Sequence, residues 1–214
     1  MSRHAIQQRD YPESAYDAAR ASGYTELQAR IIAARLPYLQ GGEVASVLSP
    51  SLSMLDAPDS LPDIDKAAQR LADAIQRKET LLVIVDHDVD GSTSLAIIKS
   101  ALCDYFLVPP ANVRTYSSHR MREGYGVSDA LVDRILADIT SPACAITADQ
   151  GSADGLRIEK LLQHGIETIV TDHHEIPVTG IPKAAIAVVN PTREDSLYPD
   201  ASIAGCYVAF LVMC

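Results

Sequence analysis

Short apolar runs that alternate with helix-forming segments constrain the fold of this chain more than any other feature. From residue 81 onward, each such run is followed by polar residues and then by a segment with helical periodicity. Apolar runs of this length are typical of strands that are buried on both faces. The pattern therefore predicts an α/β fold with a doubly wound, mainly parallel sheet of about five strands flanked by helices.

The apolar runs also place the expected elements along the chain. Strands are predicted at residues 81–85, 113–116, 143–147, 168–171 and 185–189. Helices are predicted at residues 64–78, 94–106, 128–137, 153–163 and 203–213. Ligands of such sheets bind beyond the carboxyl ends of the strands, so the polar residues that follow the runs are candidate site residues.

The sequence predicts two regions. Residues 1–60 are expected to form an N-terminal helical extension and linker, and residues 61–214 the α/β domain. "TELQARIIAARL" begins with a capping box at Thr25 and Gln28, and the later "SPSLSMLDAPDSLPD" is rich in Ser and Pro, as in a connection. The last predicted helix stops on apolar residues without a cap, which favours a domain that is incomplete at its C-terminus.

The segment "LLVIVDHDVDGSTS" (81–94) gathers three acids, Asp86, Asp88 and Asp90, directly after an apolar run. Their spacing matches the start of the calcium-binding loop of an EF-hand, which needs a bidentate Glu at its twelfth position. Counted from Asp86, that position is Ile97. A strand also precedes the loop where an EF-hand requires a helix, so the EF-hand interpretation is rejected.

The second interpretation of this segment is a catalytic metal site at the end of a strand. Residues two apart in an extended segment point to the same side, so the three acids can converge on a cation. Gly91 would let the chain turn, and Ser92 and Thr93 would begin a helix whose N–H groups favour phosphate. For this motif alone, a solvated acidic turn that binds nothing is the alternative.

The same pattern occurs after two further apolar runs. "ACAITADQGS" places Asp149 after a strand, and "TIVTDHHEIP" places Asp172, His173 and His174 after the next one. Parallel strands present their carboxyl ends at one edge of the sheet, so these side chains are expected to meet there. Carboxylate and imidazole ligands suit Mn²⁺ or Mg²⁺ better than Zn²⁺, because no thiolate accompanies them.

Composition limits the classes of function. Lys and Arg total 18 against 28 for Asp and Glu, a formal charge of −10, which argues against a generic basic nucleic-acid binder. It does not exclude an enzyme that acts on phosphates, because bound dications neutralise acidic ligands. Four scattered cysteines, and the absence of a recognisable signal peptide or membrane span, predict a cytoplasmic protein that does not associate with membranes.

Five ordered motifs together resemble the DHH phosphoesterase superfamily, and within it the RecJ-type single-strand-specific exonucleases. They are "DHDVDG" (86–91), "SHRMREGYGVS" (118–128), "ADQGS" (148–152), "TDHH" (171–174) and "VVNPTREDSLYPDASIAGCYVAF" (188–210). The resemblance implies hydrolysis of phosphodiester or phosphoanhydride bonds with two Mn²⁺ or Mg²⁺ ions. It also implies roles for particular residues.

The implied metal ligands are carboxylates and one imidazole. Asp88 and Asp90 would each hold one ion, Asp149 would bridge the two ions, and Asp86 would lie in or next to the coordination shell. His173 would complete the shell of one ion. The implied catalytic residues are Asp149, His174, which would contact the scissile phosphate, and Asp172, which would orient the histidines.

Four further residues are candidates for binding the substrate phosphate. Arg120 has the guanidinium fork that matches phosphate oxygens, although an ion pair with Glu123 is its structural alternative. His119 lies beside it, and Ser92 and Gly205 lie where helices are expected to begin. Tyr125 is expected to pack, and Asn190 to form a structural turn.

These observations favour a 5′→3′ exonuclease that acts on single-stranded nucleic acid, DNA more than RNA, in repair or recombination. Single-strand-binding or other repair proteins are further expected partners. One alternative is a phosphodiesterase for oligonucleotides or cyclic dinucleotides, although such relatives generally carry a His where this chain has Ile84. Another is an inactive scaffold of the Cdc45 type, which the retained acids and histidines argue against.

The resemblance also implies parts that would lie beyond the printed C-terminus. These are a fourth metal-binding motif with a further Asp, a DHHA1 substrate domain and an OB-type DNA-binding domain. It therefore implies lower metal affinity and activity for residues 1–214 than for a protein that carries these parts.

Overall fold

The computed structural model describes residues 9–38, 48, 55–139 and 142–214, and the chain divides into two compact units, Met1–Leu55 and Asp56–Cys214. The described part of the first unit contains α1 (Glu13–Ala21) and α2 (Glu26–Arg35), which pack on each other through small side chains. The capping box predicted at Thr25 is confirmed: the Gln28 N–H donates to Thr25 Oγ1, and the Thr25 N–H donates to Gln28 Oε1.

The second unit is built around a parallel sheet. The described residues form five strands in the order β2 (Val113–Ser117), β1 (Thr80–Val85), β3 (Ala143–Ala148), β4 (Ile166–Thr171) and β5 (Ala187–Val189). All four pairings are parallel, and Leu81 lies opposite Val113 in β2 and opposite Cys144 in β3.

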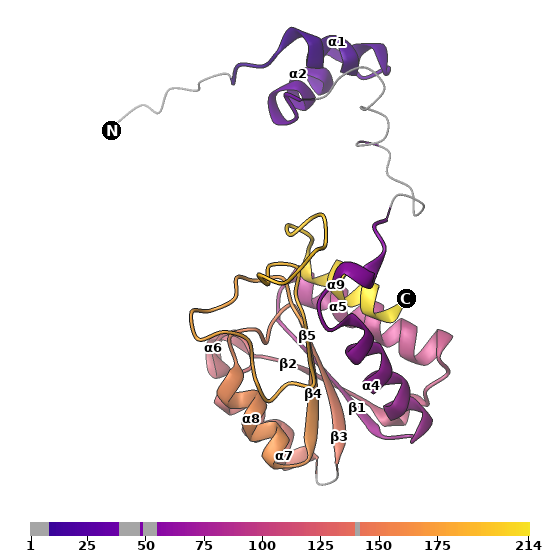
Figure 1. The fold of residues 1–214 in the computed structure, drawn as a ribbon, viewed down its shortest axis with the longest axis vertical. Coiled ribbons are helices and arrows are strands. Elements are labelled where there is room, and N and C mark those ends of the chain that lie inside the picture. The colour runs from indigo at the N-terminus through magenta and orange to yellow at the C-terminus, as the bar shows by residue number, and fades with distance from the viewer. Residues whose placement is uncertain (1–8, 39–47, 49–54, 140–141) are drawn as a thin grey trace. The chain divides into compact units, whose positions relative to one another are not determined.

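Helices cover both faces of this sheet (Figure 1). One face carries α4 (Ile64–Gln76), α5 (Val89–Ser100) and α9 (Gly205–Met213), and the other carries α7 (Asp129–Asp138) and α8 (Gly155–Gln163). Leu81, Val83 and Val85 pack on the first face, and Leu82 and Ile84 on the second. The predicted doubly wound α/β fold is therefore confirmed.

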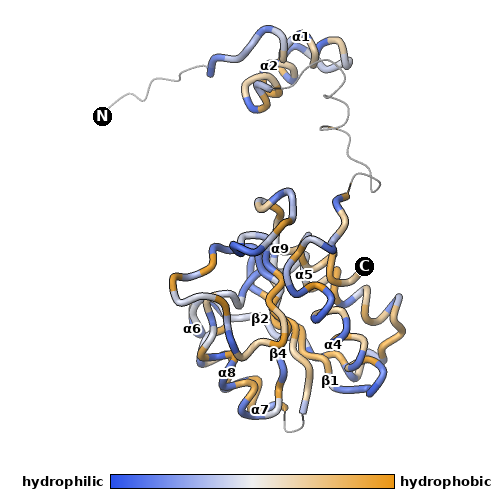
Figure 2. The backbone as a smooth tube through the Cα atoms, viewed as in Figure 1, coloured by the Kyte–Doolittle hydropathy of each residue, from blue (hydrophilic) through white to orange (hydrophobic). Residues whose placement is uncertain are grey.

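The hydropathy pattern explains this layering. Figure 2 shows apolar strands at the centre, with polar and apolar residues alternating along the flanking helices. Every residue of β3 is buried, which satisfies the expectation that its short apolar run is covered on both faces. Shorter elements complete the unit: η2 (Pro58–Ser60), the π-helical turn η3 (Ala101–Tyr105), η4 (Pro110–Asn112) and α6 (Arg120–Glu123).

The helix after β1 begins earlier than the sequence suggests. It was expected at residues 94–106, but α5 starts at Val89 because the Asp88 side chain caps it by accepting the Gly91 N–H at 3.0 Å. Asp90 and Gly91 therefore lie in the first helical turn and not in an extended segment. The prediction that all three acids converge through alternation along an extended chain was wrong for Asp90.

The strand order places the candidate site. The chain moves from β1 outward to β2 and then returns to β3 on the other side of β1, so the order reverses between β1 and β3. Ligands of open α/β sheets bind at such reversal points, beyond the carboxyl ends of the strands. Among the helices of the described residues, none is long and apolar enough to cross a membrane.

Candidate metal centre

Three acids follow three neighbouring strands, and the sheet itself aligns them. The N–H of Asp86 donates to Ala148 O, that of Asp149 to Thr171 O and that of Asp172 to Val189 O, at 3.4, 3.0 and 3.1 Å. Each bond extends the parallel ladder by one residue past the strand end. The side chains of β1, β3 and β4 that carry the chemistry thus meet at one edge, as the sequence predicted.

Two groups of three potential ligands share one residue. Among the described residues, Asp86, Asp88 and Asp149 form one group, and Asp149, His173 and His174 form the other. Within each group the candidate ligand atoms lie within 4.8 Å of one another. Asp149 therefore lies where one carboxylate could serve two ions.

The Asp149 carboxyl group is held in an unfavourable environment. Its backbone has a φ of 60°, and its side chain is nearly inaccessible, with the residue 3% exposed. Burial, followed by the negative charges of Asp90 and Asp88, raises the pKa of Asp149 to about 8. Cations bound among these acids would offset both effects.

Asp86 provides a second sign that the cluster fits a cation. Its Oδ1 accepts a hydrogen bond from His87 Nδ1 at 2.8 Å, but its buried Oδ2 has no hydrogen-bond partner among the described residues. A buried carboxylate oxygen without a partner costs free energy unless something absent from the polypeptide satisfies it. The donor set, carboxylate oxygens with imidazole nitrogen, suits Mn²⁺ or Mg²⁺.

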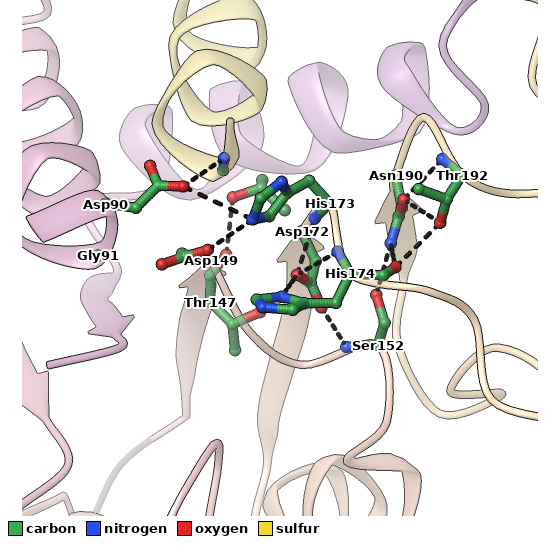
Figure 3. Close-up of polar contacts among 12 residues, drawn as sticks. Asp90, Gly91, Thr147, Asp149, Ser152, Asp172, His173, His174, Asn190 and Thr192 are labelled. Carbon is green, nitrogen blue, oxygen red and sulfur yellow. Dashed lines mark hydrogen bonds and ion pairs between the residues drawn. The ribbon is translucent and has the colours of Figure 1, made fainter. Parts of the chain in front are cut away.

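Asp90 lies beside these groups and has a second task. Its carboxylate accepts the N–H groups of Gly205 and Cys206 at 2.8 and 2.7 Å, which ties α5 to the start of α9. Burial works to raise the pKa of Asp90, but these hydrogen bonds outweigh it and lower the pKa. His173 Nε2 lies 3.6 Å from Asp90 and 3.2 Å from Asp149, between the two carboxylates (Figure 3).

Asp172 organises the histidine pair, as expected. The N–H groups of His173 and His174 and the His174 Nδ1 all contact Asp172 Oδ1, at 2.8, 3.2 and 2.8 Å, while the Ser152 N–H donates to Oδ2. The hydrogen bond with Asp172 raises the pKa of His174 to about 9. Held at Nδ1, the half-exposed His174 ring leaves Nε2 available to a ligand.

Asn190 fixes the same segment from β5. Its Nδ2 donates to Ser152 Oγ and to the backbone oxygen of His174, both at 2.9 Å, and its Oδ1 accepts from Thr192 (Figure 3). All its capacity is used inside the protein, and the residue is fully buried. These contacts agree with the predicted structural turn.

Replacing Asn190 with Ala should destabilise the chain by about 2–4 kcal/mol, because buried partners lose their hydrogen bonds. Urea denaturation at constant pH measures the change. Thr192→Ser is the matched control, since it keeps the hydroxyl that donates to the Asn190 side chain, and it should change stability by less than about 1 kcal/mol. Equal stability of Asn190→Ala and the unaltered chain would contradict this role.

Arg120 does not form the ion pair given above as its alternative. Glu123 instead pairs with Arg134 at 2.8 Å. Arg120 Nη1 contacts His87 Nε2 at 3.2 Å, and its guanidinium carbon lies 5.0 Å from the centre of the Tyr125 ring. Tyr125 was expected to pack, but it is 58% exposed.

The other candidate phosphate contacts have different environments. His119 precedes α6, and its N–H donates to Glu123 Oε2. The N–H groups of Ser92 and Gly205 were expected to be free for phosphate, but they donate to the Asp88 backbone oxygen and to Asp90. That expectation was wrong, because the carboxylate and the helix satisfy these donors first; the exposed Ser92 hydroxyl remains a candidate contact.

Two glycines allow the close packing around the cluster. A Cβ on Gly205 would lie 2.7 Å from Asp149 Oδ1, and a Cβ on Gly91 would overlap the backbone of Asp86. Ile84 lies in the core beneath α7 and supplies no ligand. His87 was not among the predicted site residues, because alternation along a strand would have turned it away from Asp86 and Asp88.

Comparison with known proteins assigns the family. The model of the DHH family N-terminal domain matches residues 62–214. The chain belongs to the DHH family. Its five parallel strands and the Asp and His residues at their carboxyl ends lie within the matched region.

The relatives are single-stranded-DNA-specific exonucleases named RecJ. The Escherichia coli protein is 32% identical over 84% of this chain, and the Thermus thermophilus protein is 32% identical over 78%. The chain spans 30% and 22% of the lengths of these two proteins. A crystal structure of exonuclease RecJ bound to manganese matches 74% of this chain and 38% of its own, with 32% identity and a TM-score of 0.60.

Proposed function

We propose that this chain is a two-metal-dependent phosphodiesterase domain that hydrolyses single-stranded nucleic acid, with DNA as the preferred substrate and a 5′→3′ exonuclease direction. The observation that carries the proposal is the sharing of Asp149 by two groups of potential ligands. Membership in the DHH family and the similarity to RecJ exonucleases, including a manganese-bound structure, support it.

The chain's own residues would divide the work. Asp86 and Asp88 would hold one ion, His173 the other, and Asp149 both, with Asp90 beside His173. Bound there, Mn²⁺ or Mg²⁺ would supply the positive charge and Lewis acidity that phosphodiester hydrolysis needs. The expectation that Asp90 is itself a ligand is retained in this proposal, because its Oδ2 faces His173 Nε2.

The histidine pair would contribute orientation and a donor. Asp172 holds His174 through Nδ1, which would leave the Nε2–H to donate to an oxygen of the scissile phosphate. Arg120 would hold a phosphate with the N–H groups that do not face His87, because a guanidinium offers several donors in one plane. Both groups would bring positive charge to a substrate that the acidic chain would otherwise repel.

The test is nucleotide release by residues 1–214 with Mn²⁺ from one oligodeoxynucleotide, offered single-stranded and as a duplex. Label at the 5′ or the 3′ end reports the direction. We expect metal-dependent release of mononucleotides from the single strand, first from its 5′ end. Faster cleavage of dinucleotides would favour the alternative phosphodiesterase, and manganese binding without hydrolysis of any of these substrates would contradict the proposal.

A further inference from the structure

A line of contacts links the acid cluster to Arg120 through His87. His87 Nδ1 lies 2.8 Å from Asp86 Oδ1, and His87 Nε2 lies 3.2 Å from Arg120 Nη1. The imidazole thus stands between a buried carboxylate and an exposed guanidinium that come from different segments of the chain. His87 itself is largely covered, with 24% of its side chain exposed.

The chemistry of the partners fixes the direction of both hydrogen bonds. A carboxylate accepts, so the hydrogen on His87 lies on Nδ1 and is donated to Asp86. A guanidinium only donates, so the Nε2 lone pair accepts from Arg120. A neutral imidazole with its hydrogen on Nδ1 satisfies both contacts at once. The buried Asp86 carboxylate selects this form.

Tyr125 restricts the guanidinium from a second side. Its ring lies edge-on to the His87 ring, with 6.0 Å between the centroids, and carries the guanidinium carbon of Arg120 at 5.0 Å from its centroid. Among the described residues, no other side chain or backbone oxygen accepts a hydrogen bond from Arg120. The remaining N–H donors of Arg120 are therefore available to a ligand, while its position is set by two rings.

We propose that His87 is a positioning residue, which holds the Arg120 guanidinium beside the Asp86 end of the metal centre to receive a phosphate of the single-stranded substrate. This inference rests on the proposed function. His87 touches neither the substrate nor an ion; it acts through Arg120. Losing the acceptor at Nε2 should therefore weaken substrate binding more than it slows hydrolysis.

Three substitutions separate the two hydrogen bonds. His87→Gln can place an amide oxygen near the position of Nε2 and retain the acceptor for Arg120. His87→Asn can place an amide N–H near the position of Nδ1, which retains the donor to Asp86 and loses the acceptor. His87→Phe keeps a ring beside Tyr125 and loses both hydrogen bonds.

Nucleotide release from a single-stranded oligodeoxynucleotide in Mn²⁺ is measured for each variant. We expect His87→Asn and His87→Phe to raise KM about tenfold, the size of one lost hydrogen bond to a charged group, with kcat changed less than about twofold. His87→Gln should stay near the unaltered chain. In an Arg120→Ala background, His87→Asn should add no further loss.

The inference is overturned if His87→Asn leaves KM unchanged, if the loss lies in kcat, or if His87→Gln is as impaired as His87→Phe. Reduced manganese stoichiometry in His87→Asn would also overturn it, because His87 would then act through Asp86. If the unaltered chain releases no nucleotide, the proposed function fails, and the side-chain nitrogen chemical shifts of His87 decide instead. An unprotonated Nε2 whose shift responds to Arg120→Ala supports the link, and a protonated Nε2 overturns it.

Discussion

Asp149→Asn should bind manganese weakly and hydrolyse no nucleic acid, yet in chelator it should be more stable than the unaltered chain at pH 8. Both effects have one cause. Asp149 offers a carboxylate to both groups of potential ligands, and without cations that carboxylate is buried beside other acids. Asparagine is the suitable replacement, because it keeps the shape and tolerates the φ of 60° at this position.

The sign of the pH dependence follows from the raised pKa. Burial and the neighbouring acids move the pKa of Asp149 from 3.8 to about 8 in the folded chain. Between these values the folded state keeps a proton that the unfolded state has lost, so raising the pH favours unfolding. The metal-free chain should therefore lose stability from about pH 4 to pH 8, and Asp149→Asn should lose less.

Thermal unfolding in chelator across this pH range measures the difference. At pH 8 the variant should be more stable by about 3 kcal/mol, or on the order of 5–10 °C in Tm, with a much smaller difference in acid. Adding Mn²⁺ should stabilise the unaltered chain and have little effect on the variant. Asp59→Asn removes an exposed charge outside the candidate metal centre and serves as the control. Parallel pH profiles for Asp149→Asn and the unaltered chain would refute this account.

Gly205→Ala should disrupt the centre almost as strongly, without removing any ligand. The added Cβ would lie 2.7 Å from Asp149 Oδ1 and 3.0 Å from its Cα, closer than real Cβ atoms approach. Either Asp149 moves or the start of α9 does, and the second movement would also break the hydrogen bonds from Gly205 and Cys206 to Asp90. We expect manganese affinity to fall at least about tenfold, the equivalent of 1.4 kcal/mol.

Gly155→Ala is the matched control for this substitution. Gly155, like Gly205, is the first residue of a helix, but a Cβ there would meet only Pro182 at 3.8 Å, an ordinary contact. Calorimetric titration with Mn²⁺ should therefore give the unaltered affinity for Gly155→Ala and a reduced affinity for Gly205→Ala. The same affinity for both variants would show that the approach of α9 to Asp149 does not matter.

The fold could be predicted because its signals are local. Each strand is a short apolar run, and the alternation of runs with helical segments leaves few arrangements other than a parallel, doubly wound sheet. The edge at which Asp86, Asp149 and Asp172 meet follows from that arrangement. Their backbone N–H groups extend the strand ladders, so no special loop geometry is needed to align them.

The parts that the sequence did not reveal depend on contacts between distant segments. Asp90 was grouped with Asp86 and Asp88 by spacing, but it lies in a helix and accepts N–H groups from the start of α9, more than a hundred residues later. The link from His87 to Arg120 likewise joins two loops, and no periodicity in either segment indicates it. Patterns along one segment predict elements, whereas such contacts require the packed structure.

Anomalous scattering from crystals grown with manganese tests the central claim most directly. Two peaks, one on each side of the Asp149 carboxylate, are predicted, the first contacting Asp86 and Asp88 and the second contacting His173. The absence of manganese from this edge of the sheet, or a single ion that does not touch Asp149, would contradict the account.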